Sequence, residues 1–118
     1  MLRRAPLRRR RATPRRSERV LDADYLARVR ELPCCARTLG DMFGCRGRIE
    51  VDHAGRKPAG RKCSDDETVP MCSLHHSERH TFIGLFGGWS RAQMRAWLDE
   101  QIAATRAHLT AAPAARSL

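Results

Sequence analysis

The sequence predicts a small α+β domain that follows a basic, disordered N-terminal arm. Two observations lead to this expectation. Positive charge is concentrated at the beginning of the chain, and the remainder changes from helical to strand periodicity and back again. A chain of 118 residues has room for one small domain. We therefore expect an arm over residues 1–20, a folded domain over 21–109 and a flexible tail over 110–118.

The N-terminal arm carries most of the net charge. Nine arginines and one acid, Glu18, lie within residues 1–20 of a chain whose total charge is +10. A block of like charge with few apolar residues cannot bury enough surface to fold. A polyanion such as nucleic acid is the expected partner, and a solubilising tail is the alternative. No apolar run approaches the ~18 residues of a membrane span, so we expect a soluble, cytoplasmic protein without membrane contact.

The first half of the domain contains a helix, a loop and a strand. Asp22 is placed to cap a short helix that Pro33 ends. Residues 34–48 are rich in Cys, Gly and Arg and predict a loop with a tight knuckle. Apolar and acidic side chains alternate over 48–53, as in a half-buried strand. The apolar face of the helix is formed by Tyr25, Leu26, Val29 and Leu32.

The second half repeats this change from extended to helical signals. A polar loop over 54–67 leads to a brief extended segment over 68–72, and the stretch 73–80 has no Gly or Pro and suits one or two helical turns. GLFGGW (84–89) interrupts that pattern, and Ser90 is placed to cap a longer helix. The apolar residues of this helix recur at helical spacing and predict one buried face: Met94, Trp97, Leu98 and Ile102.

Five cysteines in a chain without a secretion signal favour metal binding over disulfides. Cys72 and His75 form a C-x2-H pair, the spacing of half a tetrahedral zinc site. The other half needs two thiolates, for which Cys45 and either Cys34 or Cys35 are the candidates, and we favour Cys34. Such a closed site would be structural, while a set of free buried cysteines is the alternative. The remaining cysteine, at position 63, has no obvious partner.

Two further histidines in MCSLHHSERH (71–80) predict a second metal. Neighbouring residues on a helix point about 100° apart, so His75 and His76 do not easily reach one ion, whereas His76 and His80 share a face. Asp52, at the end of the strand, would complete a His2Asp face with open positions. His53 beside it is placed to act as a general base, because histidine titrates near neutral pH. Non-haem iron oxygenases use a similar triad, but nothing here suggests the barrel that they need.

Basic side chains surround these predicted ligands. The loop GRKPAGRK (55–62) contains no acid, and two more arginines precede the strand. Positive charge beside the metal face would suit a nucleic-acid backbone phosphate, and an ordinary solvated loop is the alternative. The candidate phosphate contacts are Arg46, Arg48, Arg56, Lys57, Arg61 and Lys62.

With these residues the sequence resembles the HNH, or ββα-metal, nuclease superfamily, and within it the Ref-like branch, named for a phage recombination enhancement function protein. The motifs that carry the resemblance are LPCC (32–35), IEVDHAG (49–55), GRKCSDD (60–66) and VPMCSLHHSERH (69–80). The resemblance implies a small zinc-stabilised, treble-clef-like domain with flanking helices. It also implies a DNA endonuclease that uses a divalent ion, commonly Mg²⁺. Ref-like members depend on recombinase filaments to direct cleavage.

The resemblance implies a role for each candidate residue. His53 would be the general base, and Asp52, His76 and His80 would bind the catalytic ion. The structural zinc would be held by the cysteines of the knuckle together with the C-x2-H pair: Cys34, Cys45, Cys72 and His75.

The sequence departs from the HNH pattern in two places. It contains no asparagine, although an asparagine usually supports the base or the metal. We predict that Asp65 replaces it, with Asp66 and Glu67 as alternatives. The knuckle also has nine or ten residues between its cysteines instead of two. A non-catalytic zinc-stabilised DNA- or RNA-binding module is the alternative function, and an accessory protein that cleaves only on a partner's filament is a third.

Overall fold

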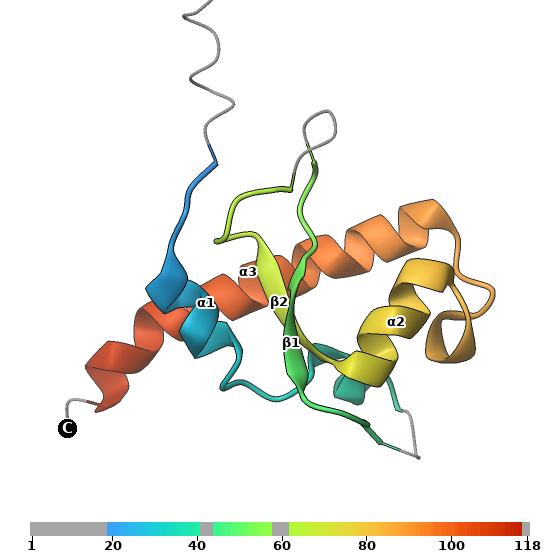
Figure 1. Cartoon of the computed structure of the whole chain (residues 1–118), viewed down its shortest axis with the longest axis horizontal. Coiled ribbons are helices and arrows are strands. Elements are labelled where there is room, and N and C mark those ends of the chain that lie inside the picture. The colour runs from blue at the N-terminus through green and yellow to red at the C-terminus, as the bar shows by residue number, and fades with distance from the viewer. Residues whose placement is uncertain (1–18, 41–43, 58–61, 117–118) are drawn as a thin grey trace, which may run out of the picture.

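A computed structural model describes residues 19–40, 44–57 and 62–116 (Figure 1). Within these residues, helices flank a two-stranded sheet, so the expected small α+β architecture is confirmed. The predicted arm lies outside the described residues as far as residue 18. The elements in chain order are α1 (Ala23–Val29), a 3-10 helix (Cys35–Leu39), β1 (Ile49–His53), β2 (Thr68–Cys72), α2 (Ser73–Thr81), a second 3-10 helix (Gly84–Phe86) and α3 (Arg91–Arg116).

The sheet consists of β1 and β2, which run antiparallel. Ile49 lies opposite Cys72, and His53 lies opposite Thr68. Every residue of β2 is buried, because the long helix α3 contacts β2 and passes behind the sheet (Figure 1). β2 leads directly into α2, which also contacts β1. The sheet and α2 therefore lie against each other.

The hydrophobic core lies between the sheet and α3. The predicted apolar face of α3 is confirmed, because all four of its residues are buried. The ring of Phe86, which is fully buried, lies 5.3 Å from the ring of Trp97 and 5.0 Å from that of Trp89, between their centroids. A second cluster joins Tyr25 and Val29 of α1 to Leu109 near the end of α3. α3 thus packs against both the sheet and α1.

Both predicted helix caps are present. The Asp22 carboxylate accepts a hydrogen bond from the Tyr25 amide at 3.0 Å. The Ser90 hydroxyl accepts from the Gln93 amide at 3.0 Å, while the Gln93 side-chain oxygen accepts from the Ser90 amide at 3.4 Å. This reciprocal pair is a capping box, which satisfies two amides at the start of α3.

The ends of two helices differ from the sequence prediction. α1 ends at Val29 and therefore does not include Leu32. α3 continues through residues 110–116, where a flexible tail was expected. Pro113 lacks the N–H that would bond to the Leu109 carbonyl four residues earlier. The Arg28 guanidinium donates to that carbonyl instead, so the Leu109 carbonyl still has a hydrogen-bond donor.

The last two residues of the predicted arm also differ from expectation, because they contact the domain. The Arg19 guanidinium donates to the Cys63 carbonyl at 3.0 Å, and the Val20 amide donates to the Ser64 hydroxyl at 2.8 Å. Residues 19 and 20 therefore belong to the folded domain. Their contacts hold the segment before α1 against the loop before β2. None of the described helices is long and apolar enough to cross a bilayer.

Candidate functional site

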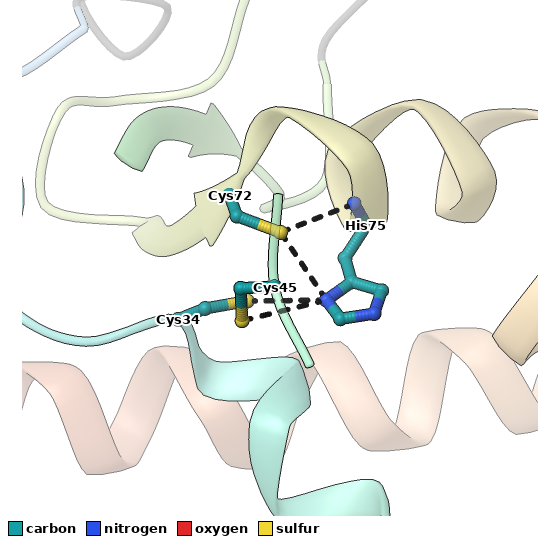
Figure 2. Close-up of side chains that lie close together, drawn as sticks. All are labelled: Cys34, Cys45, Cys72 and His75. Carbon is teal, nitrogen blue, oxygen red and sulfur yellow. Dashed lines mark hydrogen bonds between the residues drawn. The ribbon is translucent and has the colours of Figure 1, made fainter. Parts of the chain in front are cut away.

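Four sulfur and nitrogen ligands converge where the hairpin meets α2. Cys34 is the N-cap residue of the first 3-10 helix, Cys45 lies in the loop before β1, Cys72 ends β2 and His75 lies in the first turn of α2. Figure 2 shows the three sulfur atoms around one ring nitrogen of His75. Their ligand atoms all lie within 4.8 Å of one another. The predicted set is therefore brought together, with Cys34 rather than Cys35.

The spacing of these atoms suits a tetrahedral zinc ion. The His75 Nδ1 lies 3.6 Å from the Cys34 Sγ, 3.8 Å from the Cys45 Sγ and 3.3 Å from the Cys72 Sγ. With Zn–S and Zn–N bonds of about 2.3 and 2.0 Å, tetrahedral angles separate sulfur from nitrogen by about 3.6 Å. Cys34, Cys72 and His75 are buried, as expected for a closed structural site. The cluster could hold a metal such as zinc.

The electrostatics of this cluster also favour a bound cation. Burial and the neighbouring Cys34 thiol raise the pKa of Cys45 to about 12. Burial acts against ionisation of Cys72 too, but the amide of His75 donates to its sulfur and lowers the pKa of that thiol below its usual value. Ionisation of all three thiols at this distance therefore needs a positive counter-charge, which a divalent cation would supply.

The loop that carries Cys45 is fixed to the start of α2 by backbone contacts. The Ser73 amide donates to the Arg48 carbonyl at 3.0 Å, and the Leu74 amide donates to the Arg46 carbonyl at 3.2 Å. Gly47 has a φ of +84°, and a Cβ at this position would lie 1.8 Å from the Ser73 hydroxyl oxygen. Only glycine fits this close approach. Residues 46–48 of the predicted knuckle thus hold the neighbouring Cys45 at the site.

A second set of ligands lies on the other face of α2. Asp52 comes from β1, and His76 and His80 lie one turn apart on α2. The Asp52 Oδ1 is 3.6 Å from the His76 Nε2 and 3.8 Å from the His80 Nε2. One ion bound to all three at about 2.1 Å would set neighbouring ligand atoms roughly 3.0–3.4 Å apart, so the two distances from Asp52 would shorten by a few tenths of an ångström, and all three ligand atoms already lie within 4.8 Å of one another. Asp52 is buried, whereas the His80 side chain is 47% exposed, so this site is open on one side.

Two residues that the sequence analysis did not select complete this second set. The His76 Nδ1 lies 2.7 Å from the Glu50 carboxylate. Histidines that bind metals usually donate their second ring nitrogen to a carboxylate in this way. Arg79 donates from Nε and Nη2 to the two oxygens of Asp52, both at 2.7 Å. Glu50 shares a strand face with Asp52, which is the signal that could have identified it from the sequence.

These contacts set the protonation of the three candidate ligands. Burial alone would raise the pKa of Asp52, but the nearby His76 imidazole and the hydrogen bonds from Arg79 hold it well below its usual range. The nearby Asp52 carboxylate raises the pKa of His76. Burial and the Arg79 charge lower the pKa of His80. An ionised carboxylate and a largely neutral His80 are the forms that bind a metal.

His53 is paired with the predicted replacement for the missing asparagine. Its Nε2 lies 3.0 Å from the Asp65 Oδ1. The other oxygen of Asp65 accepts from the Asp22 amide at 2.8 Å, and the Arg19 guanidinium contacts Oδ1 at 3.2 Å. Burial opposes ionisation of Asp65, but these hydrogen bonds, with those from the Asp22 amide first, lower its pKa. Asp66, an alternative in the sequence analysis, lies 3.9 Å from Arg106 instead.

His53 and Asp52 leave β1 in different directions. Neighbouring residues on a strand point to opposite faces, and here Asp52 contacts α2 while His53 contacts the loop before β2. A cavity of about 490 Å³ lies on the His53 side, where its lining includes Arg48 and Lys62. A group that touches both residues must therefore sit at the end of β1, where the two faces meet.

The predicted phosphate contacts lie around both faces. Arg46, Arg48, Arg56, Lys57 and Lys62 are all exposed. Arg61 lies outside the described residues. The exposed positions leave these side chains accessible to a polyanion, and they do not by themselves identify one.

Two cysteines lie outside the four-ligand cluster. Cys35 is buried as the first residue of the 3-10 helix, and burial raises its pKa. Cys63 is buried and accepts a hydrogen bond from the Gly55 amide at 3.3 Å, which ties the two ends of the loop between the strands. Both therefore have packing roles.

Comparisons of the chain with protein-family models, with curated proteins and with solved structures find no match. Function is therefore inferred from the geometry of the chain itself.

Proposed function

We propose that this protein is a metal-dependent DNA endonuclease of the HNH type, similar to the Ref-like branch, which hydrolyses phosphodiester bonds in the cytoplasm. The observation that carries the proposal is the division of α2 between two ligand sets. His75 belongs to the four-ligand cluster, and the adjacent His76 belongs to the set with Asp52 and His80. The His53–Asp65 pair lies at the end of the same strand that supplies Asp52. Structural zinc in the first set and one divalent ion, Mg²⁺ or Mn²⁺, in the second are the cofactors of this proposal.

His53 would act as the general base. Its Nε2–H donates to Asp65, which fixes the tautomer and leaves Nδ1 free of that bond to accept a proton from the attacking water. Asp65 is itself held by the Asp22 amide and Arg19, so that the imidazole is oriented before the substrate arrives. The aspartate thereby performs the supporting role for which HNH proteins use asparagine.

The scissile phosphate would lie at the end of β1, between His53 and the second ligand set. Asp52, His76 and His80 would bind a divalent ion there, with Glu50 orienting His76. Such an ion polarises the phosphodiester and stabilises the leaving alkoxide. The two hydrogen bonds from Arg79 would help to keep the buried Asp52 ionised for this role. The exposed arginines and lysines beside both faces would hold the flanking backbone.

Nicking of supercoiled plasmid in Mg²⁺ or Mn²⁺ tests this proposal. The wild type should nick, and His53→Ala should be slower by about 10²–10⁴-fold, the range of general-base catalysis. His108→Ala is the matched control, because His108 is an exposed histidine of α3. The assay is run with and without a recombinase filament on the DNA, since the resemblance suggests such a partner. Equal nicking by wild type and His53→Ala, or none in any condition, would contradict the proposal.

A second candidate is a non-catalytic zinc-stabilised nucleic-acid-binding module. It is favoured by the exposed basic residues and by the closed four-ligand cluster, which would be sufficient for it. This candidate predicts salt-sensitive DNA or RNA binding that does not change in His53→Ala, together with no nicking.

A further inference from the structure

The side of β1 that carries the second ligand set also has a basic cavity. The cavity has a volume of about 370 Å³ and lies between the segment that follows β1, α2 and α3. Since a water molecule takes about 30 Å³, there is room for a phosphodiester group with several waters. Its lining residues are Ala54, Gly55, Arg56, Lys57, Arg79 and Arg95.

Two of the arginines in this cavity are held in place. Arg79 uses Nε and Nη2 on Asp52, so its Nη1 protons are not used in that pair. Arg95 donates to the Ala54 carbonyl at 2.6 Å and from Nε to Asp99 at 3.0 Å. Their side chains are only 12% and 26% exposed. Guanidinium groups that are already oriented lose little entropy when an anion binds.

The cavity keeps an excess of positive charge. Four cationic side chains line it, and within the part of the chain that the structure describes their acidic partners are Asp52, which pairs with Arg79, and Asp99, which contacts both Arg95 and Arg56. Asp99 is half exposed, and its contact with Arg56 is long at 3.6 Å. Two positive charges are therefore left for an anion, and the contact of Arg79 with Asp52 places that anion beside the second ligand set.

We propose that Arg56, Lys57, Arg79 and Arg95 form a binding site for one backbone phosphate of nucleic acid, next to the bond to be cleaved. Arg79 and Arg95 were not among the phosphate contacts predicted from the sequence. The inference rests on the proposed action on DNA. Because Arg79 contacts Asp52 and the phosphate site together, it is a positioning residue that joins substrate binding to the second ligand set.

The test measures the salt dependence of DNA binding without cleavage. Fluorescence anisotropy with a labelled 20-base-pair duplex is recorded in 50–200 mM KCl, on zinc-loaded protein with no further divalent ion. Each phosphate contact adds about 0.9 to the slope of log K against log salt. Arg95→Met should therefore lower the magnitude of the slope by about 0.9, whereas Arg95→Lys should keep it. Arg37→Met is the charge-matched control, since Arg37 lines a different cavity, and its slope should equal that of the wild type.

Arg79 needs a different comparison, because its removal alone leaves Asp52 buried and unpaired. The double variant Asp52→Asn with Arg79→Met removes both charges, and it is compared with Asp52→Asn alone. The double variant should have a slope lower in magnitude by about 0.9. Zinc content and circular dichroism confirm that each variant is folded.

The outcomes separate this proposal from the nuclease proposal. A protein that shows these slope changes but never cleaves DNA supports the phosphate site and contradicts the nuclease. If Arg95→Met keeps the slope of Arg37→Met, or the double variant keeps the slope of Asp52→Asn, the phosphate site is overturned, whether or not the protein cleaves DNA.

Discussion

Replacement of Cys34 by alanine should abolish zinc binding and folding, whereas the same change at the next residue should do neither. Both cysteines are buried, but only the Cys34 sulfur lies within the four-ligand cluster, 3.6 Å from the His75 Nδ1. The pair therefore separates loss of a ligand from loss of a buried thiol at nearly the same place in the fold.

The expected magnitude follows from the size of the domain. A folded unit of about 90 residues has a free energy of unfolding of roughly 5–14 kcal/mol. A structural zinc site contributes on the order of 10–16 kcal/mol of coupled binding and folding. The contribution of the metal is thus as large as the whole stability, and Cys34→Ala should be unfolded at 25 °C. Cys35→Ala keeps the cluster and should lose at most about 1–2 kcal/mol.

Metal analysis and thermal denaturation followed by circular dichroism measure both effects. Wild type and Cys35→Ala should contain one zinc per chain and unfold cooperatively, while Cys34→Ala should contain none and show no transition. Retention of zinc and of a transition within a few degrees of wild type in Cys34→Ala would refute the assignment. Loss of zinc in Cys35→Ala would refute it equally.

Three further substitutions test other parts of the site. Asp65→Ala should slow plasmid nicking by about 10²–10⁴-fold because the base loses the acceptor that orients it, with Asp66→Ala as the neighbouring control; equal rates would show that Asp65 has no part in the reaction. Glu50→Gln should weaken Mn²⁺ binding by about 10–100-fold in titration calorimetry on zinc-loaded protein, and an unchanged affinity would mean that Glu50 does not orient His76. Gly47→Ala should lower the melting temperature and zinc content, because its Cβ would overlap Ser73, whereas Gly40→Ala, with a similar φ and no atom within 4 Å, should cost only about 1 kcal/mol; equal losses would contradict the close approach.

The sequence was most informative where a local period decides the geometry. The step of about 100° between helical neighbours predicted that His75 and His76 serve different ligand sets, and the structure brings them to separate clusters. The same reasoning predicted the apolar face of α3, which is confirmed. The choice of Cys34 over Cys35 depends on the 3-10 helix: Cys34 precedes it with an extended backbone, and Cys35 turns into the core.

Contacts between distant segments were not predictable in this way. Strand alternation places Glu50 on the same face as Asp52, but its contact with His76 and that of Arg79 with Asp52 exist only because β1 packs against α2. The support of Asp65 by Arg19 and Asp22 was missed for the same reason, since residues 19–22, where the predicted arm joins the domain, show no apolar periodicity that would place them on the loop. The extension of α3 past residue 109 is accompanied by the bond from Arg28 to the Leu109 carbonyl, which is also a contact between distant segments.

Two adjacent histidines of α2 are proposed to bind two different metal ions. Measurement of the metal content tests this most directly. Purified wild type should contain one zinc and bind one further Mn²⁺, detected by electron paramagnetic resonance. The double variant His76→Ala with His80→Ala should keep the zinc and lose the Mn²⁺, while His75→Ala should lose the zinc. Loss of zinc from the double variant, or a wild type that binds zinc but no Mn²⁺, would contradict the division of α2 between structure and catalysis.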